Sequence, residues 1–163
     1  FCLSRGLGDV YKRQVLVLIA LRLLISIATP PPINPTERIQ QMFVEGKQAF
    51  EREDVDALMA MVADDFEWSG MNKEQLRYQL ANFFKNAQAL RAEYTPPMIE
   101  VRGDRATART EVKVVWNDAG PESQNAGPLE IEFRKERKRK WLIIPYEEWK
   151  VVKINGLEPV WME

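Results

Sequence analysis

The amino-acid sequence predicts an α+β fold, in which three N-terminal helices are followed by antiparallel strands. Two observations carry this prediction. Apolar residues recur at helical spacing up to Leu90, and beyond Leu90 the apolar period changes to two. Turn-forming residues such as Gly103-Asp104 then divide the second half into strands. The chain has 163 residues, which leaves the usual size of a single domain after its N-terminal region.

The first helix is expected to start at Pro35, with Asn34 as its N-cap. Its apolar stripe consists of Ile39, Met42, Phe43, Gly46, Ala49 and Phe50. Asp54 is expected to cap a second, shorter helix, which Ala63-Asp64-Asp65 ends before a short strand over residues 66–69. Asn72 opens a third helix with a capping-box pattern through Gln75.

After the third helix, further strands are expected from Arg91 onward. The first, Arg91–Val101, is broken by Pro96-Pro97. A long strand follows, and one of its faces carries Ala106, Ala108, Thr110, Val112, Val114 and Trp116. Residues 117–128 have the composition of a loop, and Leu129 begins another strand. The last strands are expected over residues 141–144 and 149–154, with a bend or bulge at Pro145.

The order of helix, Asp-rich cap, short helix and aromatic strand resembles the start of NTF2-like domains. That superfamily includes the ketosteroid isomerases and the SnoaL-type polyketide cyclases. The matching residues are Glu53-Asp54-Val55-Asp56-Ala57-Leu58 and Met61-Val62-Ala63-Asp64-Asp65, with a further similarity at Val114-Val115-Trp116-Asn117. The resemblance covers residues 34–154. It implies an NTF2-like (cystatin-like) cone, in which the three helices pack on a curved, mainly antiparallel sheet and leave a pocket at its open end.

Residues 1–14 are interpreted as foreign to the protein. Asp9-Val10-Tyr11-Lys12-Arg13-Gln14 is an in-frame translation of the transposon end used in sequencing-library kits, which indicates a metagenomic assembly artefact. An ordinary basic leader is the alternative. If the artefact interpretation holds, Cys2, the only cysteine, is not native, and no disulfide is expected.

Residues 15–28 are the most apolar run in the chain. The run is shorter than the roughly 20 residues that span a bilayer, and Ser26-Ile27-Ala28 fits a small-residue cleavage site. A bacterial signal peptide is the first interpretation and a truncated membrane anchor the second. Residues 29–34 form a proline-rich linker, and residues 35–163 form the NTF2-like domain. The expected location is the periplasm or, with an anchor, the outer side of the membrane.

The composition excludes several kinds of active site. The chain has no histidine, which excludes histidine bases and ligands, and it has no glycine-rich phosphate loop and no metal-spaced carboxylates. We therefore expect neither a cofactor nor a metal. The resemblance places the catalytic tyrosine of steroid isomerases at Gly46 and their general base in Trp68-Ser69-Gly70-Met71, where this chain has no carboxylate. No catalytic residue is predicted.

The predicted site is an apolar pocket. Its expected lining is Trp68, Phe83, Phe84, Thr110, Val112, Val114, Trp116 and Trp149, for which core packing is the alternative role. Thr110 or a tyrosine hydroxyl would orient a flat apolar ligand. Glu67 and Glu147 are the alternative acid–base residues, although a period of two turns Glu67 away from the side of Phe66.

The favoured function is non-catalytic binding of a small apolar ligand, or an accessory role, in an exported domain. The alternatives are a SnoaL- or isomerase-like enzyme that uses a pocket carboxylate, and an envelope interaction module. The basic run Arg134–Lys140 is expected at a hairpin tip, either solvated or, together with Val15–Ala28, close to lipid headgroups. Export argues against nucleic acid. A homodimer is not indicated, because the outer face of the long strand is charged.

Overall fold

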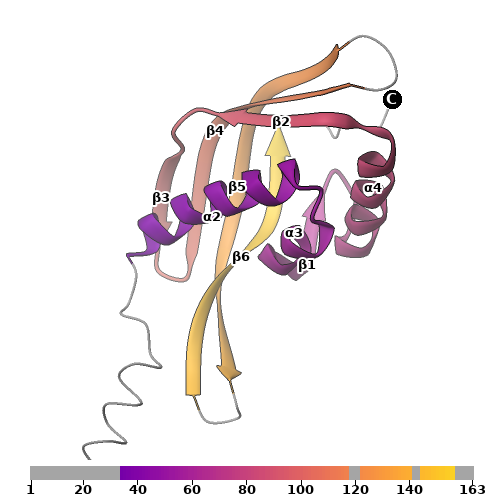
Figure 1. The fold of residues 1–163 in the computed structure, drawn as a ribbon. Helices are drawn as coiled ribbons and strands as arrows, with labels where there is room; N and C mark the ends of the chain where they lie inside the picture. Colours follow the sequence, from indigo (N-terminus) through magenta and orange to yellow (C-terminus); the bar gives the residue numbers. More distant parts are fainter. Residues whose placement is uncertain (1–33, 118–121, 141–143, 157–163) are drawn as a thin grey trace, which may run out of the picture. The chain divides into compact units, whose positions relative to one another are not determined.

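The computed structural model describes residues 34–117, 122–140 and 144–156, which form three helices and six strands (Figure 1). The predicted foreign leader, the apolar segment 15–28 and the linker up to residue 33 lie outside the described residues, and so does Trp141. A compact unit begins at Pro35, and the following paragraphs describe that unit alone.

The helices are α2 (Pro35–Glu51), α3 (Val55–Met61) and α4 (Lys73–Asn86). The predicted starts of the two later helices are confirmed. Asp54 Oδ1 accepts a hydrogen bond from the Ala57 amide at 2.9 Å. Asn72 and Gln75 form a capping box, in which each side-chain oxygen accepts from the other residue's amide at 2.9 Å. These bonds satisfy amides that have no partner within the helix.

The strands are β1 (Val62–Trp68), β2 (Gln88–Tyr94), β3 (Met98–Arg102), β4 (Arg105–Asn117), β5 (Glu122–Lys140) and β6 (Ile144–Gly156). They form one curved mixed sheet in the order β1-β6-β5-β4-β2, and β3 also pairs with β4 (Figure 1). β1 runs parallel to β6, and the other pairs are antiparallel. β2 and β3 pair with opposite ends of β4, so the predicted break at Pro96-Pro97 is confirmed.

The inner face of the sheet packs against the helices as two groups of buried residues. One joins α3, β1 and α4 and includes Met59, Val62, Phe66, Leu76, Leu80, Phe84, Ala87 and Leu90. The other joins the first half of α2 to the sheet through Ile39, Met42, Ala106, Ala108, Phe133 and Trp149. The predicted alternation of β4 is confirmed, because Ala106, Ala108, Thr110 and Val114 are buried while Arg105, Arg109 and Lys113 are exposed.

The first strand starts earlier than predicted. Ala63-Asp64-Asp65 is expected to end the second helix, but α3 ends at Met61 and β1 starts at Val62. Tertiary pairing overrides the local pattern, since Val62 lies opposite Val151 in β6. Asp64 and Asp65 are therefore strand residues.

The predicted loop over residues 117–128 is also wrong. Glu122–Pro128 forms the first part of β5 and lies opposite Asn117–Glu111 of β4. Among the described residues, β6 pairs with β5 as far as Leu129, which lies opposite Gly156. In the same part of the chain, Glu122–Pro128 has β4 as its one strand partner, and proline and small polar residues are tolerated in such an edge segment.

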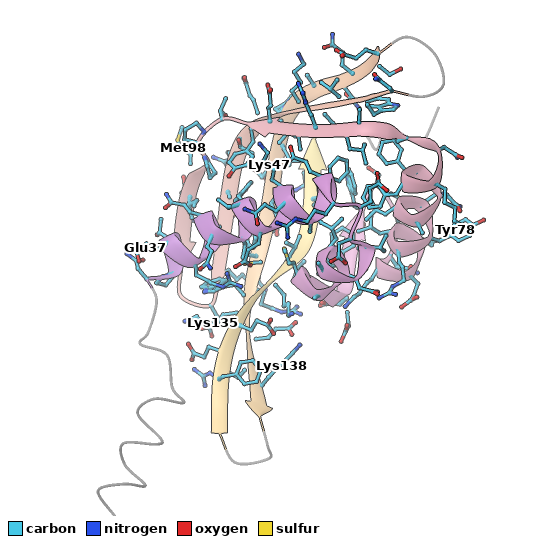
Figure 2. All side chains as sticks on the ribbon, viewed as in Figure 1. Glu37, Lys47, Tyr78, Met98, Lys135 and Lys138 are labelled. Carbon is cyan, nitrogen blue, oxygen red and sulfur yellow. The ribbon has the colours of Figure 1, made fainter. Side chains whose placement is uncertain are left out.

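The basic run Arg134–Lys140 is not a hairpin tip. It belongs to β5 and pairs with Lys150–Ile144 of β6 in a long two-stranded hairpin, on which Figure 2 labels Lys135 and Lys138. The irregularity expected at Pro145 also lies elsewhere. The register shifts between Glu132 and Phe133 instead, where β6 carries one extra residue, Val152.

Candidate ligand-binding cavity

A cavity of about 270 Å³ lies between the helices and the inner face of the sheet. All three helices contribute to its lining, as do all the strands except β3. Its walls include Met42 and Phe50 from α2, Met59 and Met61 from α3, and Leu80 from α4. The sheet supplies Val112, Val114, Ile131, Phe133, Val151 and Ile154. The lining thus draws on both groups of core residues.

The lining is almost entirely apolar. Its ionisable side chains other than Tyr94 are Lys47 of α2 and Glu93 of β2. A water molecule occupies about 30 Å³ of liquid and needs two to four polar partners when buried, so this cavity suits water poorly. An apolar cavity of about 150 Å³ is enough to bind benzene, and small-molecule sites begin at about 300 Å³. The volume therefore suits a small apolar molecule.

Gly46 opens the α2 side of the cavity. It lies on the apolar stripe of α2, where every neighbouring position in the stripe carries a larger side chain. A Cβ atom built at Gly46 would meet Met61 Sδ at 3.9 Å, an ordinary van der Waals distance, and a longer side chain would extend into the lining. The position where steroid isomerases are expected to hold a tyrosine is therefore on the cavity wall, but it carries no functional group.

The polar end of the cavity is the seam between α2 and β2. Glu51 Oε1 accepts a hydrogen bond from the Ala92 amide at 3.1 Å, which ties the end of α2 to the edge strand. Lys47 Nζ lies 3.6 Å from the same carboxylate oxygen. Lys47, Glu93 and Tyr94 also line a second hollow at the surface, together with Gln40, Val44, Pro96 and Pro97. The cavity and this hollow therefore share one boundary.

The structure places three of the eight predicted site residues on the cavity wall, namely Trp68, Val112 and Val114. The other five, Phe83, Phe84, Thr110, Trp116 and Trp149, do not line it. These five residues were expected to be cavity walls, but the structure places them elsewhere. The reason differs from residue to residue.

Two aromatic residues of α4 lie one turn too far along the helix. Leu76 and Leu80 face the cavity, whereas Phe83 and Phe84 pack behind Phe50, with ring centroids 6.2 Å and 5.4 Å from it. Trp116 packs edge-on against Phe83 at 5.8 Å. These rings form a second layer that supports the Phe50 wall.

Thr110 is buried, but its hydroxyl is committed to the backbone. Thr110 Oγ1 donates to the Thr95 carbonyl at 2.6 Å, and the Thr95 hydroxyl accepts from the Glu111 amide at 3.1 Å. These bonds hold the segment between β2 and β3 against β4. The Thr110 hydroxyl therefore fixes the fold at this point.

Trp149 is a core residue. It packs with Ile39 and Phe133, and the Lys135 ammonium lies 5.4 Å from the centroid of its ring. A cation over an aromatic face is attractive, so this contact covers the ring on its solvent side.

Sequence reasoning missed several lining residues. Lys47, Glu93, Ile131 and Phe133 line the cavity, but the sequence analysis gives none of them a site role. The feature of the sequence that could have indicated the cavity wall was Gly46, a residue without a side chain inside an apolar stripe. The rest depends on which strand lies opposite α2, which periodicity alone does not specify.

The two alternative catalytic carboxylates lie away from the cavity. Glu67 is exposed and borders a charged hollow on the outer face of the sheet, together with Asp65 and Arg134. Glu147 pairs with Lys135 at 3.2 Å and with Arg137 at 3.5 Å on the β5–β6 hairpin. Neither carboxylate can reach a molecule held in the cavity.

Two ion pairs link neighbouring elements of the domain, one between β4 and β5 and one between α4 and β1. Arg109 Nε donates to Glu130 at 2.6 Å, which lowers the pKa of that carboxyl. Lys73 donates to Asp64 at 2.9 Å and lowers the pKa of Asp64 in the same way. One partner of each pair, Arg109 or Asp64, is largely exposed, so each pair contributes little stability.

The cations of the basic run whose side chains the structure describes, Arg134, Lys135, Arg137 and Lys138, all form ion pairs with neighbouring carboxylates. Lys135 and Arg137 pair with Glu147, and Lys138 lies 3.7 Å from both Glu136 and Glu148. Among the described residues no helix is both long and apolar enough to cross a bilayer. In the same residues no group of three or more acidic, cysteine or histidine side chains is placed to hold a metal ion.

Comparison with solved structures finds many chains of similar architecture, including the following three. A protein provisionally described as an aromatic ring hydroxylase, from Novosphingobium aromaticivorans, superposes with a TM-score of 0.65 at 20% identity, over 78% of this chain and 90% of that one. An NTF2-like superfamily protein from Salmonella enterica serovar Typhimurium gives 0.62 at 14% identity, over 77% and 91%. An NTF2-like protein from Cytophaga hutchinsonii gives 0.60 at 16% identity, over 76% and 98%.

This chain has the NTF2-like fold. The resemblance seen in the sequence is thereby confirmed at the level of fold, including the three helices and the curved sheet. Comparisons with models of protein families and with curated protein sequences find no match. Sequence identities of 14–20% support a shared fold but not a shared function. The function of the NTF2-like domain therefore has to be argued from its own cavity.

Proposed function

We propose that this NTF2-like domain binds a small, flat apolar molecule in the cavity between its helices and sheet, and that it performs no chemistry on it. The observation that carries the proposal is the lining itself. Apart from the seam between α2 and β2, the walls offer burial and aromatic contact. Burial contributes roughly 25 cal/mol per Å² of apolar surface removed from water, so affinity would come from shape and area.

Proton transfer requires a group within hydrogen-bond reach of the reacting atom. Gly46 supplies none, and Glu67 and Glu147 lie elsewhere. The carboxylate that does border the cavity is Glu93, which is exposed at the seam. Glu93 therefore supports a second candidate function, an isomerase- or cyclase-like enzyme with this residue as its base. Turnover of a model enone ketosteroid that disappears in Glu93→Gln would replace the first proposal by the second.

The direct test uses N-phenyl-1-naphthylamine, a neutral probe whose fluorescence rises in apolar surroundings. We expect the full chain to bind it saturably, with one probe per chain. Gly46→Leu should weaken binding by at least about tenfold, because its side chain extends into the cavity. Gly46→Ala is the matched control, since its Cβ meets Met61 Sδ at an ordinary distance and fits.

Equal probe binding by the wild type and Gly46→Leu, with both chains folded by circular dichroism, would contradict the proposal. Loss of binding in Gly46→Ala as well would indicate a general response of α2 to substitution, which also counts against a local cavity effect.

We further propose that binding takes place outside the cytoplasm. The support is the apolar segment 15–28 and the proline-rich residues after it. Expression of the full chain in a Gram-negative bacterium should place the protein in the periplasm or the membrane fraction. Deletion of residues 15–28 should retain it in the cytoplasm, and periplasmic recovery of that deletion would refute the proposal.

A further inference from the structure

We infer that the ligand is an amphiphile with one anionic head, whose apolar body fills the cavity and whose carboxylate meets Lys47 at the seam between α2 and β2. This inference rests on the proposed function and names the ligand class. Its starting point is the distribution of polarity, because the charged groups of the lining lie at one end only.

The seam is where the cavity meets the surface. Lys47, Glu93 and Tyr94 line both the cavity and the adjoining surface hollow. Figure 2 shows Lys47 on the side of α2 that faces β2. A molecule seated in the cavity can therefore keep a polar end at this boundary while the rest of it is buried. The opposite walls provide no such group, so a ligand with two separated polar ends would leave one of them unsatisfied.

Lys47 suits the role of head-group partner. Its side chain is 37% exposed, so most of its aliphatic stem lies against the protein and lines the cavity, which leaves the ammonium at the rim. The nearest carboxylate oxygen, Glu51 Oε1, forms an ion pair with Nζ at 3.6 Å, a distance that is too long for a hydrogen bond. That oxygen already accepts from the Ala92 amide. Among the described residues, no hydrogen bond from the Lys47 ammonium is found.

The other charges at the seam oppose an anion and must be weighed. Glu51 is held by the Ala92 amide, and its side chain is 31% exposed. Glu93 is exposed, so water and salt screen its charge. A carboxylate in direct contact with the ammonium gains a charge-assisted hydrogen bond, which is about twice as strong as a neutral one. Direct contact with Lys47 should therefore outweigh the screened repulsion from Glu93.

The experiment compares three ligands with the same apolar body: octanoate, octan-1-ol and octylamine. Each displaces N-phenyl-1-naphthylamine from the full chain at pH 7. We expect octanoate to bind about threefold to tenfold more tightly than octan-1-ol, and octylamine to bind most weakly.

Lys47→Met keeps the apolar stem and removes the charge. It should abolish the preference for octanoate over octan-1-ol. Glu93→Gln should increase octanoate affinity by about twofold or more, because it removes the repelling charge at the seam.

The outcomes separate the two proposals. If the probe itself does not bind the wild type, the proposed function fails. If the probe binds but none of the three molecules displaces it, the amphiphile is refuted and the proposed function stands. If octan-1-ol and octanoate bind the wild type equally, or octylamine binds best, the cavity binds ligand but the anionic head is refuted. Retention of the octanoate preference in Lys47→Met would refute the role of Lys47.

Discussion

Arg134 reaches across β6 to Asp65 and donates one hydrogen bond to each carboxylate oxygen, both at 2.7 Å. The two residues are 69 positions apart, and their strands, β5 and β1, are separated in the sheet by β6. The bidentate pair therefore closes the outer face over three strands. Arg134, the first cation of the basic run, is therefore paired within the domain.

The Asp65 pair predicts a pH dependence. The hydrogen bonds from Arg134 lower the pKa of Asp65 below its ordinary value of 3.8. A carboxyl with a lowered folded-state pKa stabilises the fold above about pH 4, and this contribution is lost as the pH falls through the lowered pKa. Asp65→Asn should therefore lower the melting temperature at pH 7, with a loss in the range of exposed ion pairs, roughly 0.2–1 kcal/mol.

The gap between Asp65→Asn and the wild type should narrow between pH 7 and about pH 3, because the stabilisation by the ionised carboxyl is lost as the pH falls toward and through its lowered pKa. Glu67→Gln, an exposed substitution on the same strand, is the matched control and should not change the melting temperature at pH 7. A gap of equal size at both pH values would show that Asp65 acts through packing and not through its charge.

The second layer of aromatic residues predicts a stability effect. Phe84 is buried and packs edge-on against Phe50, so Phe84→Ala should cost about 3–5 kcal/mol in denaturant titration. Tyr78→Ala on the same helix is the control, because Tyr78 is 67% exposed, and it should cost less than about 0.5 kcal/mol. A loss below about 1 kcal/mol in Phe84→Ala would contradict the supporting role of this layer.

The sequence predicted the helices better than the sheet. Capping residues such as Asp54 and Asn72 act on their own helix, so their role can be read locally. The assignments of residues 62–65 and 122–128 failed because both segments are strands only through their partners, β6 and β4. Local composition does not reveal such pairing.

The sequence predicts an apolar pocket, but it does not predict the full set of residues that line the cavity. The inner face of the long strand predicts an apolar pocket, and the structure places Val112 and Val114 of that face on the cavity wall. Trp116 and Thr110 share that face but meet Phe83 and the Thr95 backbone instead. Which residues of one face touch the cavity depends on what covers each position.

The fluorescence of Trp68 should change when a ligand enters the cavity. Of the tryptophans with described side chains, Trp68 lines the cavity, whereas Trp116 and Trp149 do not. Naphthalene should change the tryptophan emission of the wild type and of Trp116→Phe to a similar extent. The change should be at least halved in Trp68→Phe, which removes the fluorophore nearest to the ligand. An unchanged response in Trp68→Phe, or its loss in Trp116→Phe, would place the ligand elsewhere.

The central claim, that a small apolar molecule occupies this cavity, is tested most directly by methyl NMR of the methionines. Met42, Met59 and Met61 line the cavity, whereas Met98 is 77% exposed on β3, a strand that does not border it. Titration of the full, methyl-¹³C-methionine-labelled chain with N-phenyl-1-naphthylamine should shift the three cavity signals together and saturably. The Met98 signal should stay in place. A shift of Met98 without the other three, or no shift of any of them while the probe binds, would contradict the account.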